Sequence, residues 1–400
     1  MTLDLVKQKY INEIYSQSVG VHEVHNDIDL PDELFNLFIR KEEFDNKIRD
    51  QWGLWEHPYS DNYQRGKLWY PEINKFFFEN YKTNFKNVWP DNHKFALCIT
   101  HDVDQISEKK TFCEKARLFN NRRVSGQKKI EAMLKTLASL TKINSYGCET
   151  EKTIKWLLDT EKKYEASASY LFHVYPSKKK SKYDCTYSFS DTYKFNKSKI
   201  NVADLCKELK KQGHDVGLHG SIHSGTDYDI MAYEKDFIEN ILEEDIVSLR
   251  QHYLNFDIRK TPGIINKCKF QIDSTLGFNR NIGFRSGICS PYRWYDCSTK
   301  KILDFIEAPL IIQDAALFSS TALEFNLNMA KSTVNKIINQ VEKYYGCCTI
   351  LFHPHLFVYA EYRELYESIL ENAKKNGAWL CSLEQLNSHW RKKKILNGDN

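Results

Sequence analysis

The sequence predicts an α/β protein in which a sheet of mostly parallel strands is flanked by helices and preceded by a mostly helical region. Two observations support this. From residue 94 to 400, short apolar runs alternate with amphipathic helical patterns, which is typical of a parallel sheet, open or closed into a barrel. The first 93 residues are rich in aromatic side chains and short of clear strand runs, so they are predicted to be mostly helical.

The chain therefore divides into a helical accessory region at 1–93 and a barrel-type domain at 94–400. The boundary falls at residues 89–92, Trp-Pro-Asp-Asn, a turn-forming cluster. Three roles remain open for the first region: it could cap the sheet, extend a substrate groove or form a dimer contact.

The alternation places each expected element in the second region. Strands are expected at 95–100, 168–174, 215–219, 302–312 (one or two strands), 348–353 and 377–381. Helices are expected at 126–142, 150–165, 202–211, 233–245, 329–344, 360–375 and from residue 382 onward. Gly213 is a stop signal for the helix at 202–211. The polar stretch 177–199 is expected to be an excursion or a hairpin.

Composition and charge exclude some classes of protein. The formal net charge is +4 over 400 residues and the pI is 8.3, without the concentrated basic face that nucleic-acid binding requires. Basic clusters at 178–182 and 391–394 are interpreted as a solvated loop and a frayed end. The alternative is attraction to anionic glycans or to a lipid surface, which leaves peripheral membrane contact open.

The start of the chain and its cysteines predict a cytoplasmic protein. Residues 1–15 lack the basic-then-apolar layout of a signal peptide, and no run approaches the ~18 apolar residues that a membrane span needs. The 11 cysteines are odd in number and have no CxxC spacing, so we interpret them as reduced and structural.

Polar residues follow the apolar runs at several points. Asp102 and Asp104 follow the first strand, His219 and His223 follow the strand at 215–218, and His353 follows the strand at 348–352. The reactive groups of a βα-barrel gather at these strand ends. Two imidazoles and one carboxylate suit zinc or a similar divalent ion, a second carboxylate suits a general base, and another histidine suits a general acid. The set fits hydrolysis of an unactivated amide.

Each signal has a plainer interpretation when it is taken alone. Asp102 and Asp104 could belong to a turn or a helix N-cap. His219 and His223 could be core histidines that bond to backbone carbonyls, and His353 could simply end its strand.

Between residues 95 and 356 the chain resembles the polysaccharide deacetylases (NodB-homology domain, carbohydrate esterase family 4). The resemblance rests on Thr100-His-Asp-Val-Asp104, His219-Gly-Ser-Ile-His223, Arg250-Gln-His-Tyr253 and Leu351-Phe-His353, in the family's order. It is strongest toward an intracellular branch with THDVD-type segments. The resemblance implies a distorted (β/α)7 barrel and removal of an N-acyl group, normally acetyl, from a sugar in surface-polysaccharide or glycolipid biosynthesis.

The resemblance also implies roles for the motif residues. Asp104, His219 and His223 would bind one divalent metal ion, with Zn2+ as the default, and Asp102 would be the base. The reverse assignment of Asp102 and Asp104 stays open.

In the same way, His353 would be the general acid, and Arg250 would orient Asp102. An N-acylated sugar or glycan is the implied partner. The residues expected to contact it are Tyr253, His252, Arg285 and Asp273.

The sequence departs from the family's pattern in four places. Val103 separates two aspartates that are usually adjacent, Gly220 replaces a Ser or Thr, and His252 replaces a Pro. The fourth family motif has no clean counterpart; residues 273–275 and 283–287 occupy that part of the chain. Arg285 in the latter segment would equally fit an ion pair with a nearby carboxylate.

Three rival functions remain. A hydrolase of the same fold that acts on another C–N bond, such as a formamide or a ureide, would use the same residues. A nucleotide-sugar glycosyltransferase would use Asp102-x-Asp104 to hold Mn2+ and would leave both histidines incidental. A carbohydrate-binding protein without catalysis would not need so complete a set.

Overall fold

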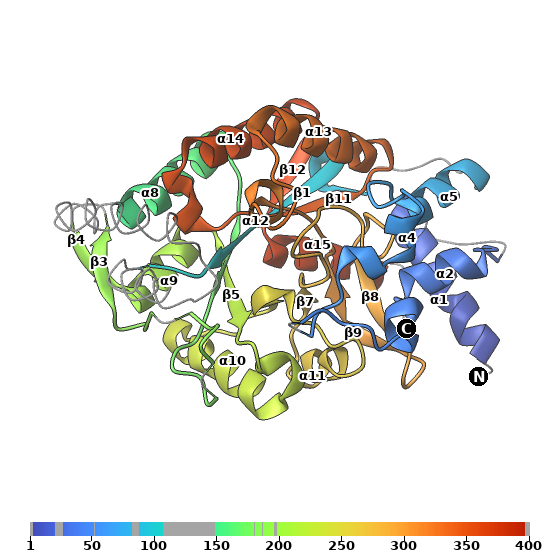
Figure 1. Ribbon diagram of the computed structural model, residues 1–400, viewed down its shortest axis with the longest axis horizontal. Coiled ribbons are helices and arrows are strands. Elements are labelled where there is room, and N and C mark those ends of the chain that lie inside the picture. The colour runs from blue at the N-terminus through green and yellow to red at the C-terminus, as the bar shows by residue number, and fades with distance from the viewer. Residues whose placement is uncertain are drawn as a thin grey trace, which may run out of the picture.

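The protein is described by a computed structural model that covers residues 3–20, 27–51, 53–81, 88–106, 149–179, 181–185, 187–195 and 198–396. The helix expected at 126–142 lies outside these ranges. In the described part, one 10-stranded sheet forms the centre of the molecule and helices cover its outer side (Figure 1). The predicted α/β fold, a distorted (β/α) barrel with a helical N-terminal region, is confirmed.

Strand β1 (Phe95–Val103) is the centre of the sheet and is buried along its whole length. It pairs in parallel with β11 (Cys347–Leu351) on one side. On the other side its first half pairs with β12 (Ala378–Cys381) and its second half with β2 (Ser169–Phe172). The sheet continues in parallel from β2 through β5 (Asp215–Gly220), β6 (Ser248–Gln251), β7 (Ile272–Asp273) and β9 (Lys301–Glu307), and from β11 to β10 (Leu310–Gln313).

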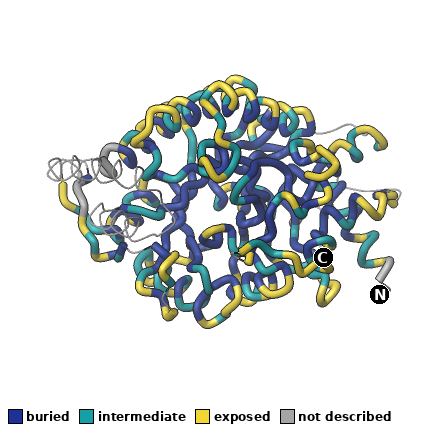
Figure 2. The backbone as a smooth tube through the Cα atoms, in the orientation of Figure 1, coloured by how far each residue is buried: buried dark blue, intermediate teal, exposed yellow. Residues whose placement is uncertain are grey.

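The sheet curls, so its strands surround a common interior (Figure 1). Figure 2 shows the buried backbone concentrated there and the exposed backbone on the outer helices and turns. The helices of this part are α8 (Glu149–Tyr164), α9 (Val202–Lys211), α10 (Tyr228–Leu242), α11 (Thr261–Lys267), α12 (Asp314–Phe318), α13 (Leu327–Lys343), α14 (Ala360–Lys375) and α15 (Leu383–Leu396). The carboxyl ends of the parallel strands consequently meet at one end of the barrel.

Helix α9 illustrates how the sequence determines these elements. Its buried residues, Val202, Leu205, Cys206 and Leu209, recur at helical spacing. A capping box between the side chains and backbones of Asn201 and Asp204 begins the helix. The predicted bounds, 202–211, are those observed.

Helix α10 begins earlier than the expected residue 233. The side chain of Asp227 accepts from the backbone N–H groups of Asp229 and Ile230 and so caps the helix. Ile230 and Met231 in this first turn are buried, so the apolar pattern begins before residue 233 and the expected start was too late.

Three strands were not expected: β6, β7 and the antiparallel β8 (Tyr292–Asp296). Each is short, and β6 and β8 carry polar or charged residues inside the strand. Residues 192–201, at the end of the polar stretch, form the hairpin of β3 (Thr192–Phe195) and β4 (Ser198–Asn201).

The N-terminal region consists of α1 (Leu3–Val19), α2 (Asp32–Phe38), α3 (Lys41–Asp45), α4 (Asp61–Gln64) and α5 (Glu72–Asn80). Most of its buried apolar side chains belong to the same buried cluster as those of the barrel. It contacts the segment 282–295, which lies between β7 and β9: Trp69 donates to the carbonyl of Ile282, and Asn62 to that of Phe284. The two predicted regions therefore share one core.

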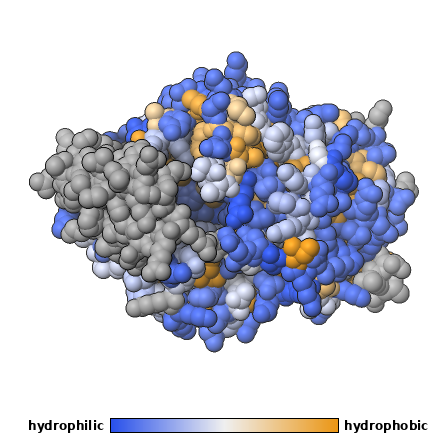
Figure 3. Space-filling view, viewed as in Figure 1, coloured by the Kyte–Doolittle hydropathy of each residue, from blue (hydrophilic) through white to orange (hydrophobic). Residues whose placement is uncertain are grey.

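The described surface seen in Figure 3 is mostly hydrophilic, with separate apolar areas. No helix in the described ranges is both long and apolar enough to cross a bilayer. The cysteines in those ranges are all free thiols.

Candidate active site

Alternation along β1 separates two sets of polar side chains. Thr100 and Asp102 face the interior of the barrel, where both contact Arg250. His101 faces the outer helices, and its Nε2 lies 2.7 Å from the carboxylate of Glu161 on α8. His101 is therefore a buried structural residue.

Arg250, on β6, joins three strands inside the barrel. Its Nη1 donates to Asp102 Oδ1 at 2.9 Å and to Thr100 Oγ1 at 2.7 Å. Its Nε and Nη2 donate to the carbonyl and the hydroxyl of Ser274, just after β7. Arg250 is fully buried and Asp102 is 2% exposed, so the guanidinium both orients the carboxylate and neutralises its charge.

Asp104, directly after β1, is half-buried beside two histidines. Its Oδ1 lies 3.4 Å from Nε2 of His219, and its Oδ2 lies 3.6 Å from Nε2 of His353. Burial alone would raise the pKa of Asp104, but the bond to His219 and the charges of His353 and His252 hold it well below its ordinary value. The carboxylate is therefore ionised at neutral pH.

Asp314 holds the predicted acid His353, and the sequence analysis did not single it out. Its Oδ1 lies 2.7 Å from His353 Nδ1, and its Oδ2 accepts from the His353 backbone N–H at 2.7 Å. Burial alone would lower the pKa of His353, but the adjacent Asp314, with Asp104 and Asp102, raises it to about 10. Asp314 follows the apolar strand β10, so the strand-end argument that found the other residues would have found it.

His219 and His252 stand side by side at the ends of β5 and β6. Their ring centroids are 4.9 Å apart, and both side chains are buried. A third imidazole, His173, follows β2; its ring centroid lies 5.8 Å from that of His252, and its Nε2 is buried without a hydrogen-bond partner. Burial lowers the pKa of His173 to about 3, so this ring is neutral.

Two groups among the described residues could hold a metal ion. One consists of Asp104, His219 and His252, and the other of His173, Cys185 and His252. A carboxylate with imidazoles, or imidazoles with a sulfur, are donor sets that zinc accepts. The predicted ligands Asp104 and His219 are brought together, whereas His223 belongs to neither group.

The predicted substrate residues lie in different surroundings. Tyr253 is 48% exposed, next to His252, with ring centroids 4.4 Å apart. Arg285 is buried and pairs with Glu43 of the N-terminal region. Asp273 is fully buried and bonds to Thr275. Burial raises its pKa to about 6.

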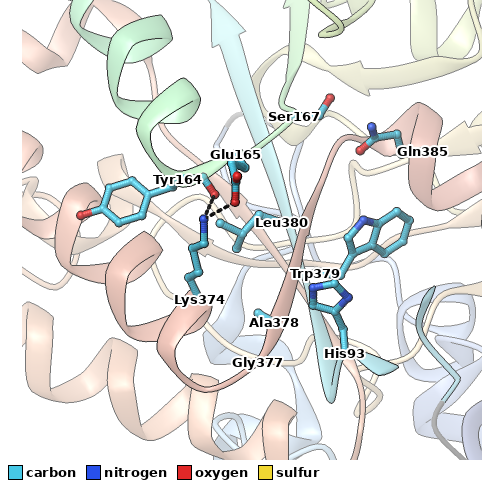
Figure 4. A pocket seen from close by; sticks show the side chains of 10 residues that line it. All are labelled: His93, Tyr164, Glu165, Ser167, Lys374, Gly377, Ala378, Trp379, Leu380 and Gln385. Atoms are coloured by element: carbon cyan, nitrogen blue, oxygen red, sulfur yellow. Dashed lines mark hydrogen bonds and ion pairs between the residues drawn. The ribbon is translucent and has the colours of Figure 1, made fainter. Parts of the chain in front are cut away.

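A separate pocket of about 400 Å3 lies at the opposite end of the strands. His93 precedes β1, Ser167 precedes β2, and Gly377 with the first residues of β12 completes this side of the pocket (Figure 4). Lys374 bridges Glu165 and the carbonyl of Tyr164 there. None of the predicted catalytic or metal-binding residues lines this pocket.

The curled sheet, with its polar groups at the carboxyl ends of the strands, has the fold of the polysaccharide deacetylases. A protein of Mycobacterium smegmatis assigned as a polysaccharide deacetylase is similar, with a TM-score of 0.50, 16% identity, and coverage of 76% of this chain and 93% of that one. Puue allantoinase and a protein of Pseudomonas aeruginosa PAO1 assigned as a polysaccharide deacetylase each reach a TM-score of 0.49 at 12% identity, over 78% of this chain and 96% of theirs. No family model and no curated protein matches the sequence.

Proposed function

We propose that the protein is a metal-dependent hydrolase that removes an N-acyl group, normally acetyl, from a sugar. One observation carries the proposal: at one end of a deacetylase-type barrel, Arg250 holds Asp102, Asp104 contacts His219, and Asp314 holds His353. These carboxylates and imidazoles lie together there, and they support a base, a cation site and a general acid at this end of the barrel. The similar protein of Mycobacterium smegmatis, assigned as a polysaccharide deacetylase, supports the same activity.

Asp104 and His219 would hold the divalent ion, with Zn2+ as the default for a carboxylate and imidazole set. His223 remains the sequence prediction for the third ligand. A divalent ion bound there would lower the pKa of a water molecule and polarise the acyl carbonyl of the substrate.

Asp102 is the proposed general base. Arg250 donates to Oδ1 of Asp102, so the carboxylate keeps one orientation. Its other oxygen, Oδ2, would take the proton of the attacking water. His353 is the proposed general acid. Its Nδ1 is engaged by Asp314, so the imidazolium that its raised pKa favours presents Nε2–H to the leaving amine.

The proposed substrate is an N-acylated sugar or glycan that passes over Tyr253, whose exposed ring offers a stacking surface. By the family resemblance, it would be a precursor in surface-polysaccharide or glycolipid biosynthesis, deacylated in the cytoplasm. Arg285 and Asp273, buried as they are, would act on the substrate only through neighbouring residues.

Metal content and acetate release test the proposal together. Wild-type protein, purified and dialysed against Zn2+, is expected to hold one equivalent of metal and to release acetate from N-acetylated sugars. Asp104→Ala and His219→Ala should lose the metal, whereas Asp102→Asn should keep it and lose the activity. Metal that survives His219→Ala but not Asp104→Ala would instead support the Asp-x-Asp transferase.

A further inference from the structure

We propose that His252, rather than His223, is the third side chain of the cation site and binds the ion together with Asp104 and His219. The inference rests on the proposed function, because it concerns the same site. It assigns a ligand role to the residue that stands where the resembled family has proline.

The first argument is distance. One ligand atom from each of Asp104, His219 and His252 can be chosen so that all lie within 4.8 Å of one another. An ion about 2.0–2.2 Å from its ligands can occupy the space between such atoms after small side-chain adjustments. The buried rings are held against each other, with centroids 4.9 Å apart.

The second argument is the way both rings are anchored. Nδ1 of His219 lies 3.1 Å from the carbonyl oxygen of Arg250, and Nδ1 of His252 lies 3.4 Å from Oδ1 of Asp184. Metal-binding histidines almost always use one ring nitrogen in this way, on a carbonyl or a carboxylate, while the other binds the ion. In both rings Nε2 is the nitrogen that this arrangement leaves for the ion.

The segment 219–223 contributes to the site through its backbone. The N–H of Ile222 donates to Asp184 Oδ1 at 2.9 Å, which fixes the carboxylate that orients His252. At His223 the chain turns into a short 3-10 helix, and the His223 carbonyl accepts from the backbone N–H of Thr226 at 3.2 Å. His223 belongs to neither possible metal group, so in this proposal the spaced pair supplies one ligand, His219, and one turn, at His223.

The third argument is the unpaired imidazole of His173. Its Nδ1 lies 3.2 Å from the carbonyl oxygen of His219, but its Nε2 is fully buried without a hydrogen-bond partner. Such a group costs free energy unless something else satisfies it. His173 forms a second, separate possible metal group together with Cys185 and His252, so His252 is the residue that both possible groups share.

The test measures metal affinity and does not depend on the substrate. Wild type, His252→Ala and His223→Ala are titrated with Zn2+ in competition with a chelator, and Co2+ spectra report the coordination. Losing an outer-shell partner typically costs 10–100-fold in affinity, so His252→Ala should lose about 100-fold or more. Asp184→Asn should lose about 10-fold, and His223→Ala should stay within about threefold of wild type. His252→Cys, which restores a ligand atom, should recover part of the affinity.

The outcomes separate the two proposals. If His223→Ala loses the ion while His252→Ala keeps it, the inference is overturned and the proposed function stands. If wild type binds neither Zn2+ nor Co2+, both fail. Far-UV circular dichroism of the metal-free proteins shows whether a variant is folded, and His252→Gln, which is closer in volume, replaces His252→Ala if that variant does not fold.

Discussion

At the scale of single residues, Arg250 connects the predicted base to the rest of the barrel through four hydrogen bonds. Arg250→Met would leave the carboxylate of Asp102 buried without its partner. Breaking a buried ion pair from one side costs about 3–5 kcal/mol, so the free energy of unfolding in urea should fall by that amount.

Arg250→Lys is the matched variant. It keeps the charge but cannot reproduce the forked contacts to Asp102 and Ser274, so it should fall between wild type and Arg250→Met. A loss below about 1 kcal/mol in Arg250→Met, the range of an exposed pair, would show that Asp102 is not held as described.

Asp314 gives a prediction on pH. The pKa of His353 in the folded protein, about 10, lies above the ordinary value of about 6.5. The stabilisation from this pair is therefore complete below about pH 6.5 and is lost as the pH rises toward 10. Asp314→Asn should lower the His353 pKa, and NMR titration of the metal-free protein should show this directly.

In the same variant the alkaline limb of the pH–rate profile should move to lower pH, because the general acid loses its proton earlier. Asp159→Asn, an exposed change on α8, is the control and should leave the limb in place. An unchanged limb in Asp314→Asn would remove His353 from its proposed role.

Much of the residue-scale pattern could be predicted because polar residues after apolar runs mark strand ends. That argument found Asp102, Asp104, His219 and His353, which the structure brings to one end of the barrel. It did not find Asp184 and Cys185, because they lie in an irregular segment between β2 and β3 that has no periodicity to place it. Whether His223 or His252 binds the ion depends on how the chain turns after β5, which spacing alone does not determine.

At the scale of elements, β5 and β6 approach each other closely because glycine stands at position 217. A Cβ atom there would lie 2.1 Å from Ser248 Oγ and 2.6 Å from the Ser248 carbonyl oxygen. Gly217→Ala should therefore destabilise the protein by about 1–3 kcal/mol, the usual cost of overpacking, as measured by thermal or urea unfolding. Ser248→Gly should relieve only part of this, since the carbonyl remains.

Gly263 provides the contrast. It lies in helix α11, and a Cβ atom there would meet nothing within 4 Å. Gly263→Ala should stabilise the protein by about 0.5–1 kcal/mol. Equal effects at the two positions would contradict the packing described for β5 and β6.

Gly220 explains one departure from the resembled family. A Cβ atom at this position would lie 2.7 Å from the side-chain oxygen and nitrogen of Gln251 and from Ser224 Oγ. The side chain of Gln251, on the neighbouring strand β6, occupies the space that a Ser or Thr side chain at position 220 would need. The sequence showed the substitution, but its reason lies in a contact between β5 and β6, and β6 was too short and too polar to be predicted as a strand.

At the scale of the whole molecule, the N-terminal region and the barrel share one buried cluster. We therefore expect one cooperative unfolding transition in calorimetry, with calorimetric and van't Hoff enthalpies in agreement. Two resolved transitions, one of them abolished by deleting residues 1–93, would show instead that the predicted regions are independent domains.

The ion pair between Glu43 and Arg285 is a specific contact across the predicted boundary. Glu43 is fully buried and also lies 3.4 Å from Arg40. Glu43→Ala would leave both guanidinium groups without this carboxylate, and the free energy of unfolding should fall by about 3–5 kcal/mol. Glu33→Ala, an exposed change in the same region, should alter it by less than about 0.5 kcal/mol. The aromatic content predicted helices here, but sequence pattern gave no indication of which barrel segment they cover.

The turn that carries Tyr253 has a consequence for protein engineering. Tyr253 and Leu254 both adopt left-handed backbone angles, with φ of 56° and 51°, which cost a non-glycine residue about 1–3 kcal/mol each. Leu254 is buried against Leu310 and Leu351, so its side chain is needed in the core. Laboratory selection for heat resistance should therefore repeatedly recover glycine or asparagine at position 253, where the side chain is exposed. A variant without Tyr253 would lose the aromatic ring beside His252 and is expected to turn over substrate more slowly. At this turn, a gain in thermostability would therefore come with a loss of activity.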